Sequence, residues 1–396
     1  MESELVLHVY DQTKNVDGHS NVHNARVCKD GPVFKAEEVE LMSMNMTAEK
    51  NAPAFDTSVT IAGVTLKNPV MTASGTFGSG AEYSEFVDLN KLGAVVTKGV
   101  ANVPWPGNPT PRIAETHSGM LNAIGLQNPG IDLFCKRDIP YLKQFDTKII
   151  VNVCGRSTED YLEVVERLGN EPVDMLEINI SCPNVKEGGI AFGQDPKAVE
   201  AITKAVKSKA KQPVIMKLSP NVTDITVMAK AAEAGGADAI SLINTLTGMK
   251  IDINRQCFAL ANKTGGLSGP AIKPIAVRMV YQAANAVSIP VIGMGGIACA
   301  EDALEFILAG ASAVSIGTAN FFNPYAAEDT VQGIEAYNAR EKVARLTDLI
   351  GIVKLKEWKV LNIKVFYGII ICRKTQIKKE ISGMEQYKKE FIEFMI

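Results

Sequence analysis

The sequence predicts a closed (β/α)8 barrel, the TIM-barrel fold, over residues 55–354 of the 396-residue chain. Short apolar runs recur eight times in this region, and segments with helical periodicity lie between them. Strands that are apolar on both faces are typical of a parallel sheet covered by helices, and eight such strands close into a barrel. An open doubly wound sheet is the rival architecture, but it usually has fewer strands.

The predicted strands are the apolar runs, each of which ends in small or polar residues. They cover residues 69–73, 94–99, 149–155, 175–181, 214–219, 239–244, 291–296 and 313–318. Helical periodicity is clear in residues 158–168, 195–209, 222–234, 273–286 and 300–308. Before the first strand, residues 58–67 alternate around a central glycine, which predicts an N-terminal β-hairpin.

Composition is that of an ordinary globular protein, with 46% hydrophobic and 21% charged residues. The formal net charge of −3 gives no electrostatic reason to expect a nucleic-acid partner. The seven cysteines have no paired spacing, so we expect reduced thiols in a cytoplasmic protein. The N-terminus does not resemble a signal peptide, and the most apolar stretch, residues 365–372, is far shorter than the roughly 20 residues of a membrane span. We therefore expect no membrane insertion.

The two ends of the chain differ from the middle. Residues 1–50 are polar, hold three of the four histidines and lack sustained periodicity, so we predict a poorly ordered extension. Residues 55–354 form the predicted barrel domain. Residues 355–396 are rich in Lys and Ile, and we predict a second, flexible extension there.

Polar residues follow the apolar runs, at the ends where a (β/α)8 barrel places its active site. These positions hold Ser74, Lys98, Asn152, Asn179, Lys217, Asn244 and Thr245. Any one of them could simply cap a strand or face solvent. A purely structural barrel, however, does not need two lysines and three asparagines at one face. The set therefore predicts a site for a planar ligand that bears a carboxylate and amide edges.

Glycines follow the last two predicted strands. GMGG (293–296) and IGT (316–318) each place glycine at a strand end before a helix, where backbone N–H groups can approach a phosphate. Either motif alone could serve a simple turn, but their joint position predicts the usual phosphate site of such barrels. GGLSGPA (265–271) adds a third glycine-rich turn before a helix.

Cys182 follows the fourth predicted strand, and Pro183 then prevents helical continuation. The thiol is therefore predicted on a loop at the barrel mouth, where it could act as a general base. The alternative is an inert core cysteine. Lys217 and Lys98 also have two interpretations: a Schiff-base lysine of an aldolase, or a cation that stabilises negative charge on a reduced flavin.

Nine segments together resemble the dihydroorotate dehydrogenase family, in its class 1B, NAD-linked form. They are ASGTFGSG (73–80), TKGV (97–100), NAIGLQNPG (122–130), EINISCPN (177–184), KLSPNVTDI (217–225), INTLTG (243–248), GGLSGPAIKP (265–274), GMGG (293–296) and IGTANF (316–321). The resemblance covers essentially all of residues 55–354. The membrane-bound class of this activity has Ser at the position of Cys182 and an N-terminal membrane helix, and both differences point away from it.

The resemblance implies a role for each matching residue. FMN would be held by Ser74, Lys98, Gly99, Asn152, Asn179, Lys217, Ile243, Gly269, Gly295, Gly296, Gly317 and Thr318. The substrate would be held by Lys98, Asn122, Ala123, Ile124, Gly125, Leu126, Asn179, Asn244 and Thr245. Cys182 would be the catalytic base, and no metal site is implied on this chain.

The implied reaction is the oxidation of (S)-dihydroorotate to orotate in de novo pyrimidine (UMP) biosynthesis. C5 of the substrate would lose a proton to Cys182, and C6 would pass a hydride to flavin N5. The electrons would reach NAD through a partner subunit that carries FAD and a [2Fe–2S] cluster. The implied assembly is a heterotetramer built on a homodimer of barrels.

The ends of the chain resemble neighbouring pyrimidine proteins. ARVCKDGPVFKAEEVEL (25–41) is similar to the C-terminus of the electron-transfer subunit of class 1B enzymes, where the matching cysteine is one of four cluster ligands. Cys28 lacks the other three and should not hold a cluster alone. A zinc site made of His19, His23 and Cys28 is a weaker alternative with too few ligands.

MEQYKKEFIEFMI (384–396) resembles the first helix of orotate phosphoribosyltransferase. These end segments suggest that the chain is a conceptual read-through of adjacent genes, with an enzyme that starts near Met44 or Met46 and ends near Lys354. Genuine flexible tails are the alternative. Mass spectrometry of the native protein distinguishes the two, because a full-length 42.6 kDa species contradicts the read-through.

Three other functions stay open on the sequence alone. A class 1A-like enzyme would use FMN only and pass electrons to fumarate. An aldolase barrel would form a Schiff base on Lys217 or Lys98. A non-catalytic barrel would bind a phosphate-bearing ligand without reaction.

Overall fold

A closed barrel of eight parallel strands forms the centre of the protein. The computed structural model describes residues 55–180 and 192–353. The strands are β3 (Val70–Thr72), β4 (Ala94–Val96), β7 (Lys148–Val153), β8 (Met175–Asn179), β9 (Val214–Lys217), β10 (Ala239–Leu242), β15 (Val291–Met294) and β16 (Ala313–Ile316). They follow one another around the barrel in chain order, and β16 pairs with β3 to close it. All the predicted strand segments are confirmed.

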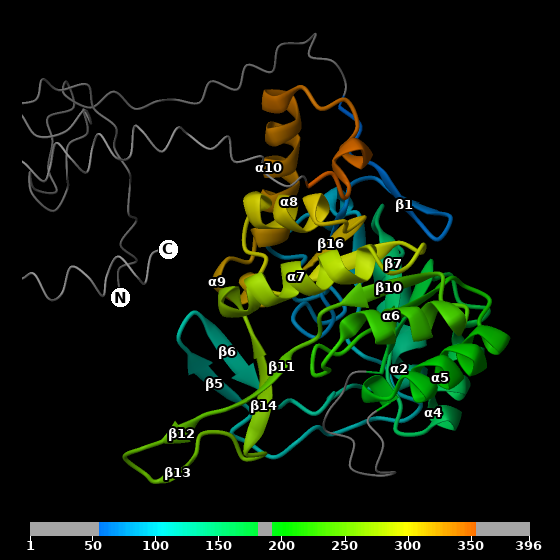
Figure 1. Cartoon of the computed structure of the whole chain (residues 1–396). Coiled ribbons are helices and arrows are strands. Elements are labelled where there is room, and N and C mark those ends of the chain that lie inside the picture. Colours follow the sequence, from blue (N-terminus) through cyan, green and yellow to red (C-terminus); the bar gives the residue numbers. More distant parts are fainter. Residues whose placement is uncertain (1–54, 181–191, 354–396) are drawn as a thin grey trace, which may run out of the picture. The chain divides into compact units, whose positions relative to one another are not determined.

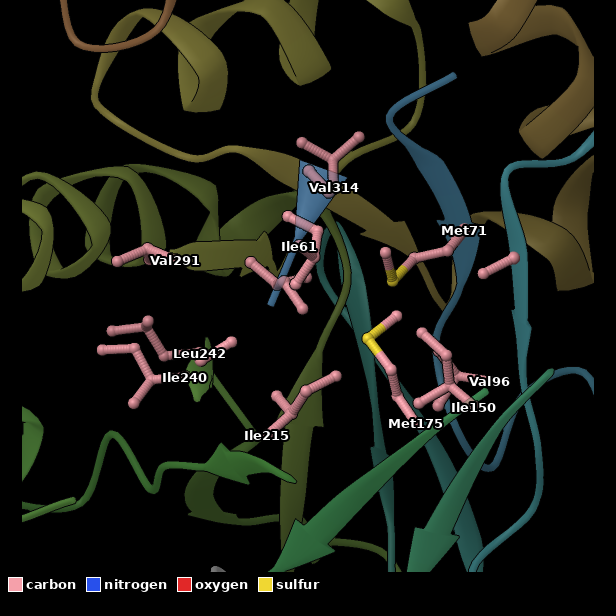
Figure 2. Packing of buried hydrophobic residues seen from close by; sticks show 14 of the residues in the cluster. Ile61, Met71, Val96, Ile150, Met175, Ile215, Ile240, Leu242, Val291 and Val314 are labelled. Carbon is pink, nitrogen blue, oxygen red and sulfur yellow. The ribbon is translucent and has the colours of Figure 1, made fainter. Parts of the chain in front are cut away.

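The strands are apolar because they are buried on both faces. Apart from Lys148, every residue of these eight strands is buried. Figure 2 shows Met71, Met175 and Ile215 among the side chains that fill the core. Each such side chain stabilises the fold by roughly 1.5–3 kcal/mol on burial. The barrel is therefore a packed scaffold that leaves only the strand ends for chemistry.

Helices surround the barrel (Figure 1). The predicted ones are confirmed as α4 (Thr158–Leu168), α5 (Pro196–Lys209), α6 (Ile225–Ala234), α7 (Lys273–Ala284) and α8 (Ala300–Leu308). Ser157, Asp195 and Asp224 cap the first three by accepting a backbone N–H, an interaction worth about 1 kcal/mol each. The cap at Asp224 explains why α6 begins three residues after its predicted start at residue 222.

The predicted hairpin is present as β1 (Val59–Ile61) and β2 (Val64–Leu66), which pair antiparallel. Its turn holds Ala62 and Gly63, both with positive φ (50° and 83°). Ile61 and Leu66 are fully buried and join the core cluster of the barrel, and Figure 2 shows Ile61 beside strand residues.

An antiparallel sheet beside the barrel was not predicted. It contains β5 (Ile113–Thr116), β6 (Gly119–Asn122), β14 (Thr264–Ser268) and β11 (Leu246–Met249), in the order β11-β14-β6-β5. The hairpin β12 (Ile251–Asp252) and β13 (Cys257–Phe258) extends from it, away from the barrel (Figure 1). The prediction of a glycine-rich turn at 265–271 was wrong in its first half, because Gly265 and Gly266 lie in β14. A Cβ on Gly266 would stand 2.0 Å from Thr245 Oγ1, so this glycine allows close packing.

The remaining elements are short, apart from one long helix. They are η2 (Leu89–Lys91), α2 (Ile131–Leu133), η3 (Phe134–Asp138), α3 (Ile139–Leu142), η4 (Phe192–Gln194), η5 (Pro270–Ile272), α9 (Ala319–Phe322), α10 (Ala326–Glu341) and η6 (Leu346–Leu349). Within residues 55–180 and 192–353, none of the helices has the length and apolar character needed to cross a bilayer. The predicted extensions, residues 1–50 and 355–396, lie outside the described residues and stay predictions.

Candidate active site

A cavity of about 800 Å³ opens at the carboxyl ends of the barrel strands. The following predicted site residues line it: Ser74, Lys98, Gly99, Asn122, Ile124, Gly125, Leu126, Asn152, Asn179, Lys217, Ile243, Asn244, Thr245, Gly269, Gly295, Gly296, Gly317 and Thr318. Residues that are far apart in the sequence thus meet in one cavity, because parallel strands end at the same side of a barrel.

Two predicted residues stand apart from this set. Ala123 does not line the cavity: it is 1% exposed and packs with Leu121 and Leu260 in a separate cluster. Its amide donates to the carbonyl of Arg112, so the backbone also faces away. Cys182 lies outside the described residues, and its position stays a prediction.

Long polar side chains form one wall, which we call the side-chain wall: Ser74, Lys98, Asn152, Asn179, Lys217 and Asn244. Lys217, at the end of β9, is only 4% exposed. Its Nζ donates to Ser74 Oγ at 3.0 Å and lies 3.5 Å from Glu177 Oε2. Lys98 Nζ lies on the same wall, 3.9 Å from where a Cβ on Gly75 would stand. The wall therefore brings two cations to one cavity.

The three asparagines of this wall form a chain of hydrogen bonds, which we call the amide relay. Asn179 Nδ2 donates to Asn152 Oδ1 at 3.5 Å, and Asn244 Nδ2 donates to Asn179 Oδ1 at 3.4 Å. The backbone amide of Thr245 donates to Asn244 Oδ1 at 2.8 Å. The relay holds three side-chain amides in one orientation across the cavity.

Glu177 is a residue that the sequence prediction missed. It lies on β8, two residues before Asn179, and is 2% exposed. Its carboxylate accepts hydrogen bonds from Asn152 Nδ2 at 2.6 Å and Ser241 Oγ at 2.7 Å, and it pairs with Lys217. The available signal was an acidic residue inside an apolar strand, on the same face as Asn179.

Backbone rather than side chains forms the opposite wall, which we call the glycine wall: Gly269, Gly295, Gly296, Gly317 and Thr318. Gly269, Gly295 and Gly296 have positive φ (101°, 118° and 82°). A Cβ on Gly296 would stand 2.9 Å from the carbonyl oxygen of Gly269 and 2.8 Å from Lys273 Cβ. Side chains are therefore excluded at this point, and the main chain itself borders the cavity.

The amide nitrogens of the glycine wall are available to a ligand. Among the described residues, no backbone or side-chain acceptor is bound by the amide of Gly295, Gly296, Gly317 or Thr318. The helix that follows Thr318, α9, has only four residues, so its dipole adds little. Gly317 is less constrained than its neighbours, because a Cβ there would meet only Ala73 Cβ, at 3.5 Å.

An ion pair holds the glycine wall from behind. Lys273 Nζ lies 2.7 Å from Asp302 Oδ1, and the other oxygen of Asp302 accepts the amide of Ala298 at 2.9 Å. Burial acts to raise the pKa of Asp302, but the hydrogen bonds from Lys273 and Ala298 outweigh burial, and the pKa lies below its usual value. Asp302 thus fixes the segment that follows Gly296.

The two walls fit FMN. The amides of the glycine wall suit a phosphate, and the cations and amides of the side-chain wall suit the polar edge of a flavin ring. Two further buried hydroxyls on the cavity wall, Thr116 and Ser315, have no partner within the described residues. Among these residues no group of histidine, cysteine or acidic side chains could hold a metal ion. The cavity is thus built for a polar, phosphate-bearing group.

Comparison with known proteins agrees with this interpretation. The family model for dihydroorotate dehydrogenase matches residues 57–337. The chain is 73% identical over 300 residues to dihydroorotate dehydrogenase B (NAD(+)), catalytic subunit, of Lachnoclostridium phytofermentans, which covers 76% of this chain and 100% of that protein. It is 67% identical over 293 residues to the protein of the same name from Alkaliphilus metalliredigens, covering 74% of this chain and 97% of that one.

A solved structure shares the fold. The crystal structure of DHODH in complex with ferulenol from Eimeria tenella matches with a TM-score of 0.64 and 24% identity, over 77% of this chain and 90% of that chain. At that identity the likeness shows the barrel fold alone.

A second family model matches the N-terminal part of the chain. It is the iron-sulfur cluster binding domain of dihydroorotate dehydrogenase B, and it matches residues 13–40, which include Cys28. This match overlaps the segment in which the sequence resembles the electron-transfer subunit. The match over residues 57–337 and the near-complete coverage of the relatives together establish that the chain belongs to the dihydroorotate dehydrogenase family, whose members are FMN-dependent oxidoreductases.

Proposed function

We propose that the cavity binds FMN and dihydroorotate, and that the chain oxidises dihydroorotate to orotate in pyrimidine biosynthesis. The observation that carries the proposal is the pairing of two unlike walls in one cavity. A phosphate needs backbone amides, while a planar anionic substrate and a flavin ring need cations and amides that face them. The relatives named above support the substrate assignment.

The roles divide between the two walls. We assign the phosphate end of FMN to Gly269, Gly295, Gly296, Gly317 and Thr318, and the ring to Ser74, Lys98, Gly99, Asn152, Asn179, Lys217 and Ile243. We assign dihydroorotate to Lys98, Asn122, Ile124, Gly125, Leu126, Asn179, Asn244 and Thr245. Ala123 acts only by packing under this loop, since it does not reach the cavity.

The mechanism separates the proton from the hydride. FMN, when bound, supplies the acceptor for the hydride that leaves C6 of the substrate. Cys182 takes the proton from C5 as the general base. Lys98 and the amide relay hold the substrate carboxylate and ring edges, so that the reacting C–H bonds have one orientation. The chain thus contributes position, charge and one proton acceptor.

A Schiff-base reaction suits the cavity less well. Lys217 Nζ already has Ser74 and Glu177 as partners. A Schiff base on that nitrogen would keep at most one of the three N–H donors of the ammonium, so it could not bind both partners. A buried polar group that loses its partner is costly. Lys217 is therefore assigned to the flavin rather than to a covalent intermediate.

The electrons are proposed to leave through a partner. The relatives are named as catalytic subunits of an NAD(+) enzyme, and residues 13–40 match a domain that binds an iron-sulfur cluster. We infer a partner subunit with FAD and a [2Fe–2S] cluster that passes electrons to NAD, in a cytoplasmic heterotetramer around a dimer of barrels. Cys28 alone cannot hold the cluster.

One experiment tests the function directly. The purified full-length chain is expected to show a flavin absorbance spectrum that bleaches when dihydroorotate is added without oxygen. A protein that carries flavin but does not bleach contradicts the proposed substrate. Adding NAD with and without the partner subunit then tests the acceptor: reduction of NAD only with the partner supports the proposal, and oxidation by fumarate alone supports a class 1A-like enzyme.

A further inference from the structure

We propose that Glu177 is a positioning residue. It sets the net charge that the side-chain wall presents to the bound flavin, and thereby the redox potential of that flavin. This inference rests on the proposed function, because it requires FMN against the side-chain wall. Glu177 does not line the cavity itself, and it acts through Lys217 and Asn152, which do. On β8 it lies directly opposite Asn152 of β7 and two residues before Asn179, which lies opposite Lys217 of β9.

One carboxylate oxygen of Glu177 is shared between Asn152 and Lys217. Glu177 Oε2 accepts Asn152 Nδ2 at 2.6 Å and lies 3.5 Å from Lys217 Nζ. The other oxygen accepts Ser241 Oγ at 2.7 Å. Three residues from three different strands thus hold the carboxylate in place, and its charge is directed at Lys217.

Both charged groups of this pair are buried. The side chains of Lys217 and Glu177 are 5% and 3% exposed, so water screens their charges little. Among the described residues, Glu177 is the acidic side chain paired with Lys217. The pair therefore presents a compensated cation to the cavity. Without Glu177 the same lysine would present a full positive charge.

The charge near a flavin affects how easily it is reduced. A reduced flavin carries more negative charge than an oxidised one, so a nearby cation favours reduction and a nearby anion opposes it. Lys217 and Glu177 act in opposite directions on the same ring. We infer that the carboxylate keeps the flavin easier to reoxidise, which suits an enzyme that must hand its electrons on.

Glu177 also fixes the orientation of the side-chain amides in the amide relay. A carboxylate only accepts hydrogen bonds, so Asn152 must turn its NH2 group toward Glu177 and its oxygen toward Asn179. At the other end of the relay, the backbone amide of Thr245 donates to Asn244 Oδ1, so the NH2 group of Asn244 is turned toward Asn179. The single carboxylate thus serves both the cation and the relay.

The test is the midpoint potential of the FMN-loaded, full-length chain in a double-variant cycle. Glu177→Gln keeps the shape and removes the charge, and the potential is expected to rise by at least about 30 mV, which corresponds to a tenfold preference for reduced flavin. Lys217→Met is expected to lower the potential. The double variant E177Q/K217M, which replaces the buried pair by neutral groups, is expected to lie between the two single variants.

Two further variants distinguish an effect of the Glu177 charge from an effect of lowered stability. Glu177→Asp keeps the charge and is expected to shift the potential less than Glu177→Gln. Thr203→Val removes a buried hydroxyl that donates to Val199 within α5, remote from the cavity, and is expected to lower stability without moving the potential. If Lys217→Met fails to fold, the comparison between wild type and Glu177→Gln carries the test. If Glu177→Gln fails to fold, the comparison between Lys217→Met and the double variant carries it, because that pair also differs only in the Glu177 charge.

The outcomes are distinct. If the removal of the Glu177 charge raises the potential in neither background, the inference is overturned. If the wild-type chain binds no flavin, or binds flavin that dihydroorotate does not bleach, the proposed function fails instead.

Discussion

The two walls of the cavity solve the problem of binding in opposite ways. The side-chain wall depends on what its residues carry: the ammonium of Lys217, its partner Glu177 and three asparagine amides. The glycine wall depends on what its residues lack, because a Cβ at Gly296 would collide with the backbone of Gly269. Substitutions should therefore act differently on the two walls. On the first they should change chemistry and charge, and on the second they should change whether the cofactor fits at all.

The largest effect is expected at Cys182, which follows β8 in the sequence. Cys182→Ala removes the proposed base and should slow flavin bleaching by dihydroorotate about 10²- to 10⁴-fold, the usual contribution of a positioned general base. FMN content should not change, because Cys182 is not assigned to the cofactor. Stopped-flow absorbance measures the rate. A bleaching rate within tenfold of wild type would remove Cys182 from the mechanism.

A smaller effect, of a different kind, is expected on the glycine wall. Gly296→Ala places a Cβ at φ +82°, 2.9 Å from a carbonyl oxygen, and should lower the free energy of unfolding by about 2–4 kcal/mol. The Kd for FMN should rise at least about tenfold, since the main chain must move away from the phosphate. Urea unfolding and titration of the apoprotein with FMN measure the two quantities.

Gly63→Ala is the matched control for this variant. Gly63 has nearly the same φ, +83°, but a Cβ there would meet nothing within 4 Å. This variant should lower stability by about 1 kcal/mol through backbone strain alone and should leave FMN affinity unchanged. Equal FMN affinity in the two variants would show that the glycine wall does not bind the phosphate.

The barrel could be predicted from the sequence because its strands are buried on both faces. Strands such as β4 and β15 contain no polar side chain, so their sequences show a continuous apolar run. The sheet of β5, β6, β11 and β14 escaped prediction because its residues are largely half-exposed and several are glycines. β5 and β6 form a local hairpin, but the sheet is completed only when β6 pairs with β14, which is distant in the sequence, and local sequence does not encode that pairing.

In the site, too, some residues could be predicted from the sequence and others could not. Residues at or just after the carboxyl end of each strand could be predicted because the fold places them at one face. Glu177 was missed because it lies in the middle of β8, whereas the predicted residues lie at the carboxyl ends of their strands. Ala123 was included because residues 122–126 were assigned as a block. In the structure Asn122 and Ile124 line the cavity while Ala123 between them is buried on the other side.

A third variant probes how firmly the side-chain wall holds its cation. Ser74→Ala removes the hydroxyl that accepts Lys217 Nζ at 3.0 Å but leaves the pair with Glu177 intact. Loss of one such hydrogen bond costs about 1 kcal/mol, so FMN affinity should fall about fivefold. Ser84→Ala is the control, because it removes a hydroxyl that bonds to Ala81 and Tyr141 instead. No difference between the two variants would mean that Ser74 does not support Lys217 in the bound state.

The smallest effect is expected behind the glycine wall, at Asp302, and it should be present at pH 7 and disappear in acid. The pKa of Asp302 lies below its usual value in the folded chain, despite burial, because Lys273 and the amide of Ala298 bind its carboxylate. A lowered folded-state pKa contributes stability above the unfolded value of 3.8, and this contribution is lost as the pH falls through the lower folded value. Asp302→Asn should therefore be less stable than wild type at pH 7, and the difference in unfolding free energy should shrink below about pH 4. Urea unfolding at several pH values measures this, with FMN retention at pH 7 as a second measurement, because the variant loosens the segment after Gly296. A difference that stays constant down to pH 3 would mean that the charge of Asp302 does not hold this wall, and that its shape alone does.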